Sequence, residues 1–220
     1  MEIKKYMHCC LVINNNQQSI VIDPGVWSDD FVPPTNTVGI IITHDHPDHF
    51  DLEKVHAVTQ ANPDVTVYST RALCNQMTGL KTQPVQAGES MDCGQFNIKF
   101  TGGEHASVDT SFPPIINLGV IINHDFYYPG DSFTLVSVPI KTLAVPLAGP
   151  WMRTAEAIDF LYNIKPREFF TVHDEILSDA GRQTYNAWME IASKRSGCDF
   201  IAYDKDTKLP VAFKASDQKI

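Results

Sequence analysis

The sequence predicts an α/β fold whose two halves pack sheet to sheet, with helices on the outside. Short apolar runs alternate with helical patterns near both ends of the chain, and the middle is rich in strand patterns. No Ser/Gly-rich linker or low-complexity stretch separates these segments. Sheets and helices of this kind become stable when each buries its apolar face in a shared layered core. We therefore expect residues 1–220 to form a single domain.

The N-terminal part of the chain predicts a hairpin, a buried strand and a helix. Two β-branched runs, Cys9–Ile13 and Ser19–Asp23, flank a polar Asn/Gln turn, as in a β-hairpin. The nearly continuous apolar run 38–43 suits a strand that is buried on both faces. Apolar residues then recur at helical spacing over Asp51–Gln60. A strand at Val65–Tyr68 and a short helix at Thr70–Met77 follow.

The rest of the chain predicts a series of strands and two longer helices. A helical stripe covers Thr154–Ile164, and a second helix runs over 178–194 with Ser178 as its expected N-cap. On this second helix, Tyr185, Trp188 and Met189 are expected to face the core. The predicted strands are Pro84–Ala87, Phe96–Thr101, Ile115–Ile122, Phe126–Tyr128, Leu143–Pro146, Glu168–Val172, Asp199–Tyr203 and Leu209–Phe213.

The charge balance excludes two classes of partner. Lys and Arg total 17 against 26 Asp and Glu, which gives a formal net charge of −9. Neutralising nucleic-acid phosphates needs clustered Lys and Arg, and the sequence has no cationic run. An anionic membrane surface is disfavoured for the same reason. We expect a small-molecule substrate as the partner, and the composition leaves room for a homo-oligomer.

The cysteines and the N-terminus indicate the compartment. The 5 cysteines are an odd number without CxxC spacing, which is typical of free thiols in a reducing environment. The N-terminus lacks the apolar segment of a signal peptide, and no apolar run approaches the roughly 18 residues of a membrane span. We therefore expect a cytoplasmic protein.

The segment Thr43–His49 concentrates metal-binding chemistry. It holds three imidazoles and two carboxylates in seven residues, directly after an apolar strand. His44 and His46 lie on the same side of an extended segment, so both rings can reach one ion. Asp48 and His49 lie beyond a proline turn and can address a second point nearby. Imidazole and carboxylate together suit borderline divalent metals, and such polar groups would otherwise be costly after a buried strand.

This segment, His44-x-His46-x-Asp48-His49, resembles the signature of metallo-β-lactamase-fold hydrolases. The resemblance runs from about Cys9 to about Trp188, with the motifs in order and at plausible spacing. It implies a four-layer αββα sandwich. The other motifs that carry it are Asp23-Pro24-Gly25, Gly102-Gly103-Glu104-His105 on an expected loop, Gly130-Asp131-Ser132, and His173 after the strand Glu168–Val172.

Within the superfamily, the sequence looks like the small L-ascorbate-6-phosphate lactonase-like branch. The segment 146–152, the helix carrying Glu156 and the opening His8-Cys9-Cys10 are similar to that branch. Asp174-Glu175 after the last motif histidine departs from the pattern, because the family often has a tyrosine or another residue there. The chain length leaves no room for an added nuclease recognition domain, which agrees with the charge.

The resemblance implies a dinuclear metal site. Two divalent ions are expected, with zinc favoured by the donor set and manganese second. Asp48 would also act catalytically by steering the proton of the nucleophile, and Asp23 would hold the ligand loop by hydrogen bonds. The first ion would be held by His44, His46 and His105, the second by Asp48, His49 and His173, and Asp131 would bridge them.

Other polar and aromatic residues have less specific roles. His8 reads as a structural histidine, His56 as a surface residue and His124 as part of a hairpin turn, while Asp45 points outward. Three loop residues are candidates for a substrate pocket, although aromatic residues are often core and an arginine at a helix start is often on the surface. These are Trp27, Trp151 and Arg153.

Together these observations predict a metal-dependent hydrolase in which two ions activate water for attack on an ester, lactone or phosphodiester. The ions would dominate the local field, so the substrate can be anionic in spite of the net charge. Two alternatives remain. One is a mono-iron dioxygenase on the same fold, using His44, His46 or His105, and Asp131. The other is a non-catalytic, metal-stabilised binding protein.

Overall fold

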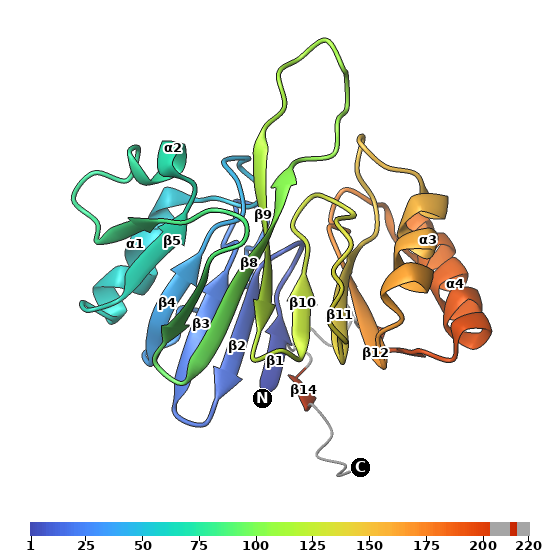
Figure 1. The fold of residues 1–220 in the computed structure, drawn as a ribbon, viewed down its shortest axis with the longest axis horizontal. Helices are drawn as coiled ribbons and strands as arrows, with labels where there is room; N and C mark the ends of the chain where they lie inside the picture. Colours follow the sequence, from blue (N-terminus) through green and yellow to red (C-terminus); the bar gives the residue numbers. More distant parts are fainter. Residues whose placement is uncertain (203–211, 215–220) are drawn as a thin grey trace. The chain divides into compact units, whose positions relative to one another are not determined.

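The computed structural model describes residues 1–202 and 212–214, and these form two compact units. The first unit contains Met1–Pro84, Cys93–Phe96 and residues 212–214, and the second contains Val85–Asp92 and the described residues from Asn97 onward. Each unit is built on one seven-stranded sheet (Figure 1). The predicted α/β class is confirmed in both units. The grouping of residues 1–220 into one domain stays a prediction.

The sheet of the first unit joins an antiparallel half to a parallel half. Its order is β14-β1-β2-β3-β4-β5-β6. Strands pair antiparallel from β14 to β3 and parallel from β3 to β6. The elements are β1 (Glu2–Lys5), β2 (Leu11–Asn15), β3 (Gln18–Ile22), β4 (Thr37–Ile41), α1 (Leu52–Ala61), β5 (Thr66–Ser69), α2 (Arg71–Cys74), β6 (Thr82–Pro84) and β14 (Ala212–Lys214).

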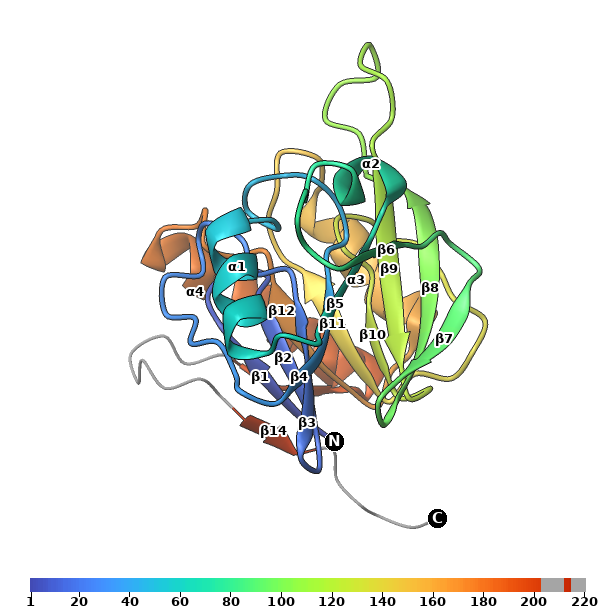
Figure 2. The ribbon, with the colours of Figure 1, turned by 90° about the vertical axis from the view of Figure 1, so that its left-hand side faces the viewer.

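Two helices cover one face of this sheet, and each begins at a predicted position. The Asp51 side chain accepts a hydrogen bond from the backbone N–H of Glu53 at the start of α1, as expected of an N-cap. Thr70 caps α2 in the same way. Figure 2 shows α1 lying across the strands. Val55 and Val58 of α1 are buried against sheet residues such as Ile40.

The sheet of the second unit also joins an antiparallel half to a parallel half. Its order is β13-β12-β11-β10-β9-β8-β7. Strands β8, β9 and β10 pair antiparallel, and β10 to β13 pair parallel. The elements are β7 (Ser90–Cys93), β8 (Phe96–Glu104), β9 (Ile116–Ile122), β10 (Phe126–Tyr128), β11 (Thr142–Pro146), α3 (Thr154–Ile164), β12 (Glu168–Val172), α4 (Asp179–Ser196) and β13 (Asp199–Phe200).

Helices α3 and α4 pack beside β11 and β12 (Figure 1). Phe160 and Leu161 of α3 join Met189 of α4 and Phe169 of β12 in one buried cluster. The prediction for Trp188 is wrong, because its side chain is 50% exposed while Met189 is 0% exposed. Neighbouring residues on a helix point about 100° apart, so the stripe that buries Met189 turns Trp188 toward solvent.

Most predicted elements are confirmed, with three differences. Strands β1 and β7 were not predicted. The predicted strand Pro84–Ala87 lies instead at Thr82–Pro84. Strand β8 continues to Glu104, so Gly102-Gly103-Glu104 is wrong as a loop: these residues pair with β9. Of the predicted strand Leu209–Phe213, only residues 212–213 lie within the described part of the chain, in β14.

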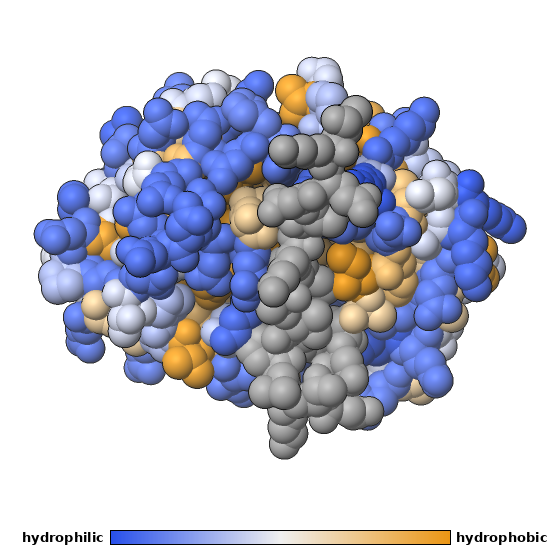
Figure 3. All heavy atoms as spheres, turned by 90° about the horizontal axis from the view of Figure 1, so that it is seen from below, coloured by the Kyte–Doolittle hydropathy of each residue, from blue (hydrophilic) through white to orange (hydrophobic). Residues whose placement is uncertain are grey.

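The surface and the cysteines agree with the composition. Figure 3 shows mainly hydrophilic side chains on the described part of one face. All five cysteines are buried, and none of them forms a disulfide in the described part of the chain. Among the described residues, no helix has both the length and the apolar character required to cross a bilayer.

The burial difference on α4 gives a first prediction. We expect Met189→Ala to lower the free energy of unfolding by about 2–5 kcal/mol, because it leaves a cavity in a packed core. Trp188→Ala should cost no more than about 1 kcal/mol, since half of the side chain already faces water. Urea denaturation of both variants measures the difference. Equal losses in the two variants would contradict this assignment of the helix faces.

Candidate metal centre

The histidine motif of the first unit lies between β4 and α1, and Asp23 fixes its start. The Asp23 carboxylate accepts a hydrogen bond from the Thr43 backbone N–H at 2.8 Å and another from the Thr43 hydroxyl at 2.7 Å. Thr43 Oγ1 in turn lies 3.0 Å from His44 Nδ1. Asp23 therefore sets the direction in which the chain leaves the strand and presents the first histidine.

Asp23 also reaches the end of the motif. Its Oδ2 lies 2.7 Å from His49 Nδ1, and both side chains are fully buried. A carboxylate accepts hydrogen bonds, so His49 Nδ1 carries the proton. The lone pair of His49 Nε2 is then available to bind a metal ion. This arrangement is the outer hydrogen bond that metal-ligating histidines usually make.

The glycine of the Asp23-Pro24-Gly25 turn allows the motif to approach. A Cβ atom on Gly25 would lie 1.9 Å from the backbone oxygen of Asp48 and 2.6 Å from the backbone nitrogen of His49. Both are backbone atoms and cannot rotate away. Only glycine fits at this position, because the turn and the motif pass within van der Waals contact of one another.

The four side chains of the motif that could bind a metal form two neighbouring pairs. His44 Nε2 lies 3.1 Å from His46 Nδ1, a separation that two ligands of one ion also have when each is about 2.0–2.1 Å from it. Asp48 Oδ2 lies 3.7 Å from His49 Nε2. The rings of His44 and His49 are 4.1 Å apart between centroids. The motif side chains thus lie close together, and their assignment to two ions stays a prediction.

His8 lies beside the histidine motif, although its sequence position suggested only a structural role. Its Nε2 lies 3.0 Å from Asp48 Oδ2, and its ring packs edge to face on Trp27 with a centroid distance of 4.8 Å. His8 is buried and has a φ of 60°, which non-glycine residues rarely adopt. Its partner is 40 residues away, so no local pattern could have revealed the contact.

In the second unit, the three predicted ligands come together at one edge of the sheet. His105 follows β8, Asp131 follows β10 and His173 follows β12. Strand β9 is antiparallel to both β8 and β10, and β10 to β12 pair parallel, so β8, β10 and β12 run in the same direction. Their C-terminal ends therefore lie at the same edge, which is where ligand-binding residues of such sheets are expected.

Asp131 stands between two imidazoles at this edge. Its Oδ2 lies 3.3 Å from His105 Nε2 and 2.9 Å from His173 Nε2. All three residues are buried. Asn117 fixes the loop, because its side chain accepts a hydrogen bond from the Asp131 backbone N–H at 3.0 Å and donates one to the Pro129 carbonyl at 2.8 Å.

The outer hydrogen bonds indicate which ring atoms face Asp131. His105 Nδ1 lies 2.6 Å from the Ala106 carbonyl, and His173 Nδ1 contacts the Ala148 carbonyl. Carbonyls only accept, so each Nδ1 carries a proton, and in the neutral tautomer each Nε2 presents a lone pair. Lone pairs of two imidazoles and a carboxylate converge favourably around a cation. The donor set therefore fits a divalent metal.

The departure at Asp174-Glu175 has a structural explanation. Arg182 of α4 places Nη1 2.5 Å from Asp174 Oδ2 and Nη2 3.2 Å from Glu175 Oε2. Arg182 and Asp174 are buried. Such a pair is costly to break, by about 3–5 kcal/mol. The ion pairs thus attach the residues directly after His173 to helix α4, a link that sequence spacing did not suggest.

The three predicted pocket residues differ in their surroundings. Trp151 is buried, and its ring lies 5.7 Å from both His105 and His173 between centroids. Trp27 is 41% exposed beside His8. The Arg153 side chain is 81% exposed and pairs with Glu156 at 3.3 Å at the start of α3.

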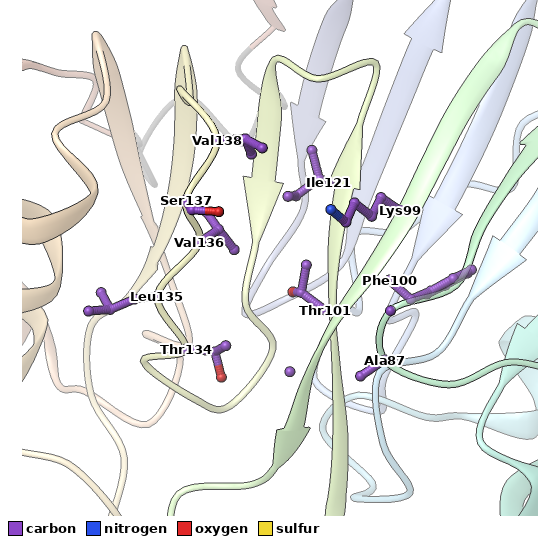
Figure 4. A pocket seen from close by; sticks show the side chains of 12 residues that line it. Ala87, Lys99, Phe100, Thr101, Ile121, Thr134, Leu135, Val136, Ser137 and Val138 are labelled. Carbon is purple, nitrogen blue, oxygen red and sulfur yellow. The ribbon is translucent and has the colours of Figure 1, made fainter.

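A separate cavity of about 280 Å³ lies in the second unit (Figure 4). Strands β8 and β9 and the loop 134–138 line it, and the three predicted pocket residues do not. The Tyr127 hydroxyl donates to the carbonyl of Thr134, one of the lining residues, at 2.8 Å. Burial raises the pKa of Tyr127 to about 12, so this hydroxyl remains a donor at neutral pH.

Comparisons with known proteins identify the family and the fold. Residues 2–173 match the family described as beta-lactamase superfamily domain. The chain is 28% identical over 190 residues to Protein Rv0786c of Mycobacterium tuberculosis, covering 84% of this chain and 89% of that protein. It is 27% identical over 170 residues to a UPF0173 metal-dependent hydrolase of Carboxydothermus hydrogenoformans, covering 70% and 69%. The structure of Igni18, a metallo hydrolase from Ignicoccus hospitalis, has a TM-score of 0.74 at 16% identity, covering 98% and 99%.

Fold, donor groups and relatives together define a metal-dependent hydrolase with the metallo-β-lactamase fold. Because the family match covers most of its length, the chain belongs to the beta-lactamase superfamily domain family. The superfamily resemblance and the hydrolase class predicted from the motifs are confirmed. The lactonase-like branch and the ligand assignments stay predictions.

The close approach at Gly25 gives a second prediction. We expect Gly25→Ala to lower the free energy of unfolding by about 1–3 kcal/mol or more, because the added methyl overlaps fixed backbone. Gly181→Ala is the matched control: the Cβ there meets side-chain atoms at 3.4 Å or beyond inside helix α4. It should be neutral or stabilise by up to about 1 kcal/mol. Urea titration of both variants tests this, and a Gly25→Ala protein as stable as the control would contradict it.

Proposed function

We propose that the protein hydrolyses an ester, lactone or phosphodiester bond of a small substrate at a site that holds two divalent ions. The observation that carries the proposal is the position of Asp131, whose Oδ2 faces His105 Nε2 at 3.3 Å and His173 Nε2 at 2.9 Å. In the ligand assignment taken from the family motifs, these two histidines serve different ions. A carboxylate that faces both is suited to bridge them.

The assignment of the other ligands follows the donor pairs of the first unit. His44 and His46 would hold one ion together with His105, and Asp48 and His49 would hold the other together with His173. The 3.1 Å and 3.7 Å separations within the two pairs support this division. Imidazole and carboxylate donors favour zinc, with manganese as the second choice.

When bound, two such ions lower the pKa of a coordinated water and polarise the scissile carbonyl or phosphoryl group. Their four positive charges exceed the negative charges of Asp48 and Asp131, so an anionic substrate fits at this point of an acidic protein. The ester, lactone or phosphodiester class follows from this chemistry. The lactone option also agrees with the resemblance to the L-ascorbate-6-phosphate lactonase-like branch.

Asp48 has a second role in the proposal, as the catalytic carboxylate that receives and steers the proton of the attacking water. The His8 ring nitrogen Nε2 lies 3.0 Å from Asp48 Oδ2 and orients the carboxylate. The Asp48 side chain is still 15% exposed. A carboxylate with one oxygen held by an imidazole keeps lone pairs for a proton at the other.

The surroundings of the donors suggest how the substrate is bound. Trp151 lies beside His105 and His173 and would form an apolar wall, and Trp27 beside His8 would form another. Arg153 is exposed and could contact an anionic group only from the rim. We further propose a cytoplasmic protein that acts on small molecules rather than on nucleic acid or membranes, and we leave its assembly into a homo-oligomer to measurement.

Metal removal gives the third prediction. We expect the protein purified without chelators to carry about two ions per chain, and chelation to reduce turnover on lactone and phosphodiester panels to background, with recovery on adding zinc or manganese. Asp131→Asn should lower the bound metal. Asp45→Asn is the matched control, since Asp45 is exposed within the same motif. Elemental analysis and turnover measure both effects. Fewer than about one ion per chain after reconstitution would refute the proposal.

The role of Asp48 gives the fourth prediction. We expect Asp48→Asn at saturating metal to lower kcat by about 10²–10⁴-fold, the range typical of losing a general acid or base. The metal content of the same sample must be measured, because Asp48 is also a proposed ligand. Full turnover with both ions bound would exclude a catalytic role for Asp48 and leave the ligand role to be judged by affinity.

A further inference from the structure

A thiol lies beside the Asp48 and His49 donors of the first unit. Cys9, His8 and His49 each offer one ligand atom, and these atoms lie within 4.8 Å of one another. Cys9 is 1% exposed. Asp48 Oδ2 approaches the same group, at 3.0 Å from His8 Nε2 and 3.7 Å from His49 Nε2. Cys9 is not among the ligands that the family resemblance implies.

These separations are close to those within one coordination sphere. Zinc lies about 2.3 Å from a thiolate sulfur and about 2.0–2.2 Å from imidazole or carboxylate donors. Donors that share a zinc ion are therefore at most about 4.6 Å apart, and closer in a tetrahedral arrangement. The sulfur of Cys9 can reach an ion held by Asp48 and His49 with side-chain adjustment alone.

We propose that Cys9 is a thiolate ligand of the ion held by Asp48 and His49, and that it makes this position selective for zinc over manganese. The inference rests on the proposed function, because it needs that ion to be present. As the metal–sulfur bond forms, the thiol S–H bond breaks and its proton leaves to solvent. His8 then acts as a positioning residue, donating to Asp48, rather than as a ligand.

The neighbouring cysteine shows that a buried thiol in this segment need not face the donors. Cys10 belongs to the apolar cluster with Val12, Val21 and Ile40. Burial raises the pKa of the Cys10 thiol well above its ordinary value. Cys10 therefore has the behaviour of a core residue, whereas Cys9 sits among two imidazoles and a carboxylate.

Thiolate coordination has a consequence for metal choice. Soft thiolate ligands favour zinc, while manganese favours carboxylate, carbonyl and water oxygens. Among the described residues, the metal-binding group that contains His44 and His46 has no cysteine, so the two positions should differ in selectivity. We expect manganese to bind less tightly than zinc at the Asp48 position, and the difference to depend on Cys9.

Cobalt substitution tests the proposal directly, because a thiolate bound to Co²⁺ gives a charge-transfer band in the near ultraviolet that nitrogen and oxygen ligands do not give. The full chain is titrated with Co²⁺ as wild type, Cys9→Ser and the matched control Cys10→Ser. We expect the band to appear in wild type and Cys10→Ser when cobalt fills the position held by Asp48 and His49. In Cys9→Ser we expect cobalt to bind at that position without producing the band.

Zinc affinity provides a second readout. Loss of an outer hydrogen-bond partner typically lowers metal affinity 10–100-fold, so loss of a ligand should weaken the second zinc ion by at least about tenfold in Cys9→Ser. Manganese affinity should change by less than about twofold. Should Cys9→Ser fail to fold, Cys9→Ala and zinc X-ray absorption of the wild type, with a sulfur shell near about 2.3 Å, replace it.

The outcomes separate the two proposals. Two bound cobalt ions in wild type without the band, a band that persists in Cys9→Ser, or a zinc spectrum without a sulfur shell overturns the Cys9 inference and leaves the proposed function standing. Wild type and Cys10→Ser that bind no cobalt and no zinc overturn the proposed function, and the Cys9 inference with it.

Discussion

The buried carboxylate of Asp23 is the contact on which the histidine motif depends. It accepts hydrogen bonds from the backbone N–H and the hydroxyl of Thr43, and its Oδ2 lies 2.7 Å from His49 Nδ1. A buried carboxylate is costly unless every oxygen is well hydrogen-bonded. This requirement ties the strand end before the motif to its last residue. The five residues between Thr43 and His49 then have little freedom, and their metal-binding atoms are held in place before any ion binds.

The second unit solves the same problem with strand direction instead of a turn. His105, Asp131 and His173 are far apart in sequence, yet each lies within three residues of the end of a strand, and the three strands run the same way. Sheet pairing fixes where these strands end, so the three residues meet at one edge of the sheet. Asn117 of β9 and Arg182 of α4 complete the support by bonding the Asp131 backbone and the carboxylate of Asp174.

Local patterns in the sequence predicted the hairpin, most strands, both long helices and the motif donors. They could not predict contacts that depend on distant partners, such as His8 with Asp48 or Arg182 with Asp174. They also misjudged features that depend on tertiary context. The glycines at 102 and 103 suggested a loop, but pairing with β9 keeps them in a strand. The large apolar side chain of Trp188 predicted a core position, but Trp188 lies on the face of α4 that is turned toward solvent.

Three residues of the candidate centre hold backbone conformations that non-glycine residues avoid. The φ values of His8, Asp23 and His173 are 60°, 46° and 59°. Such conformations cost about 1–3 kcal/mol each and persist where the surroundings over-determine them. Here each residue is fixed by its side chain: His8 by Asp48, Asp23 by Thr43 and His49, and His173 by the Ala148 carbonyl. The strain is thus offset by hydrogen bonds that also aim the donor atoms. A relaxed backbone at His173 would turn a proposed ligand away from Asp131, and at His8 or Asp23 it would break the hydrogen bonds that position Asp48 and His49. The strained conformations are therefore part of what holds the metal-binding atoms in place.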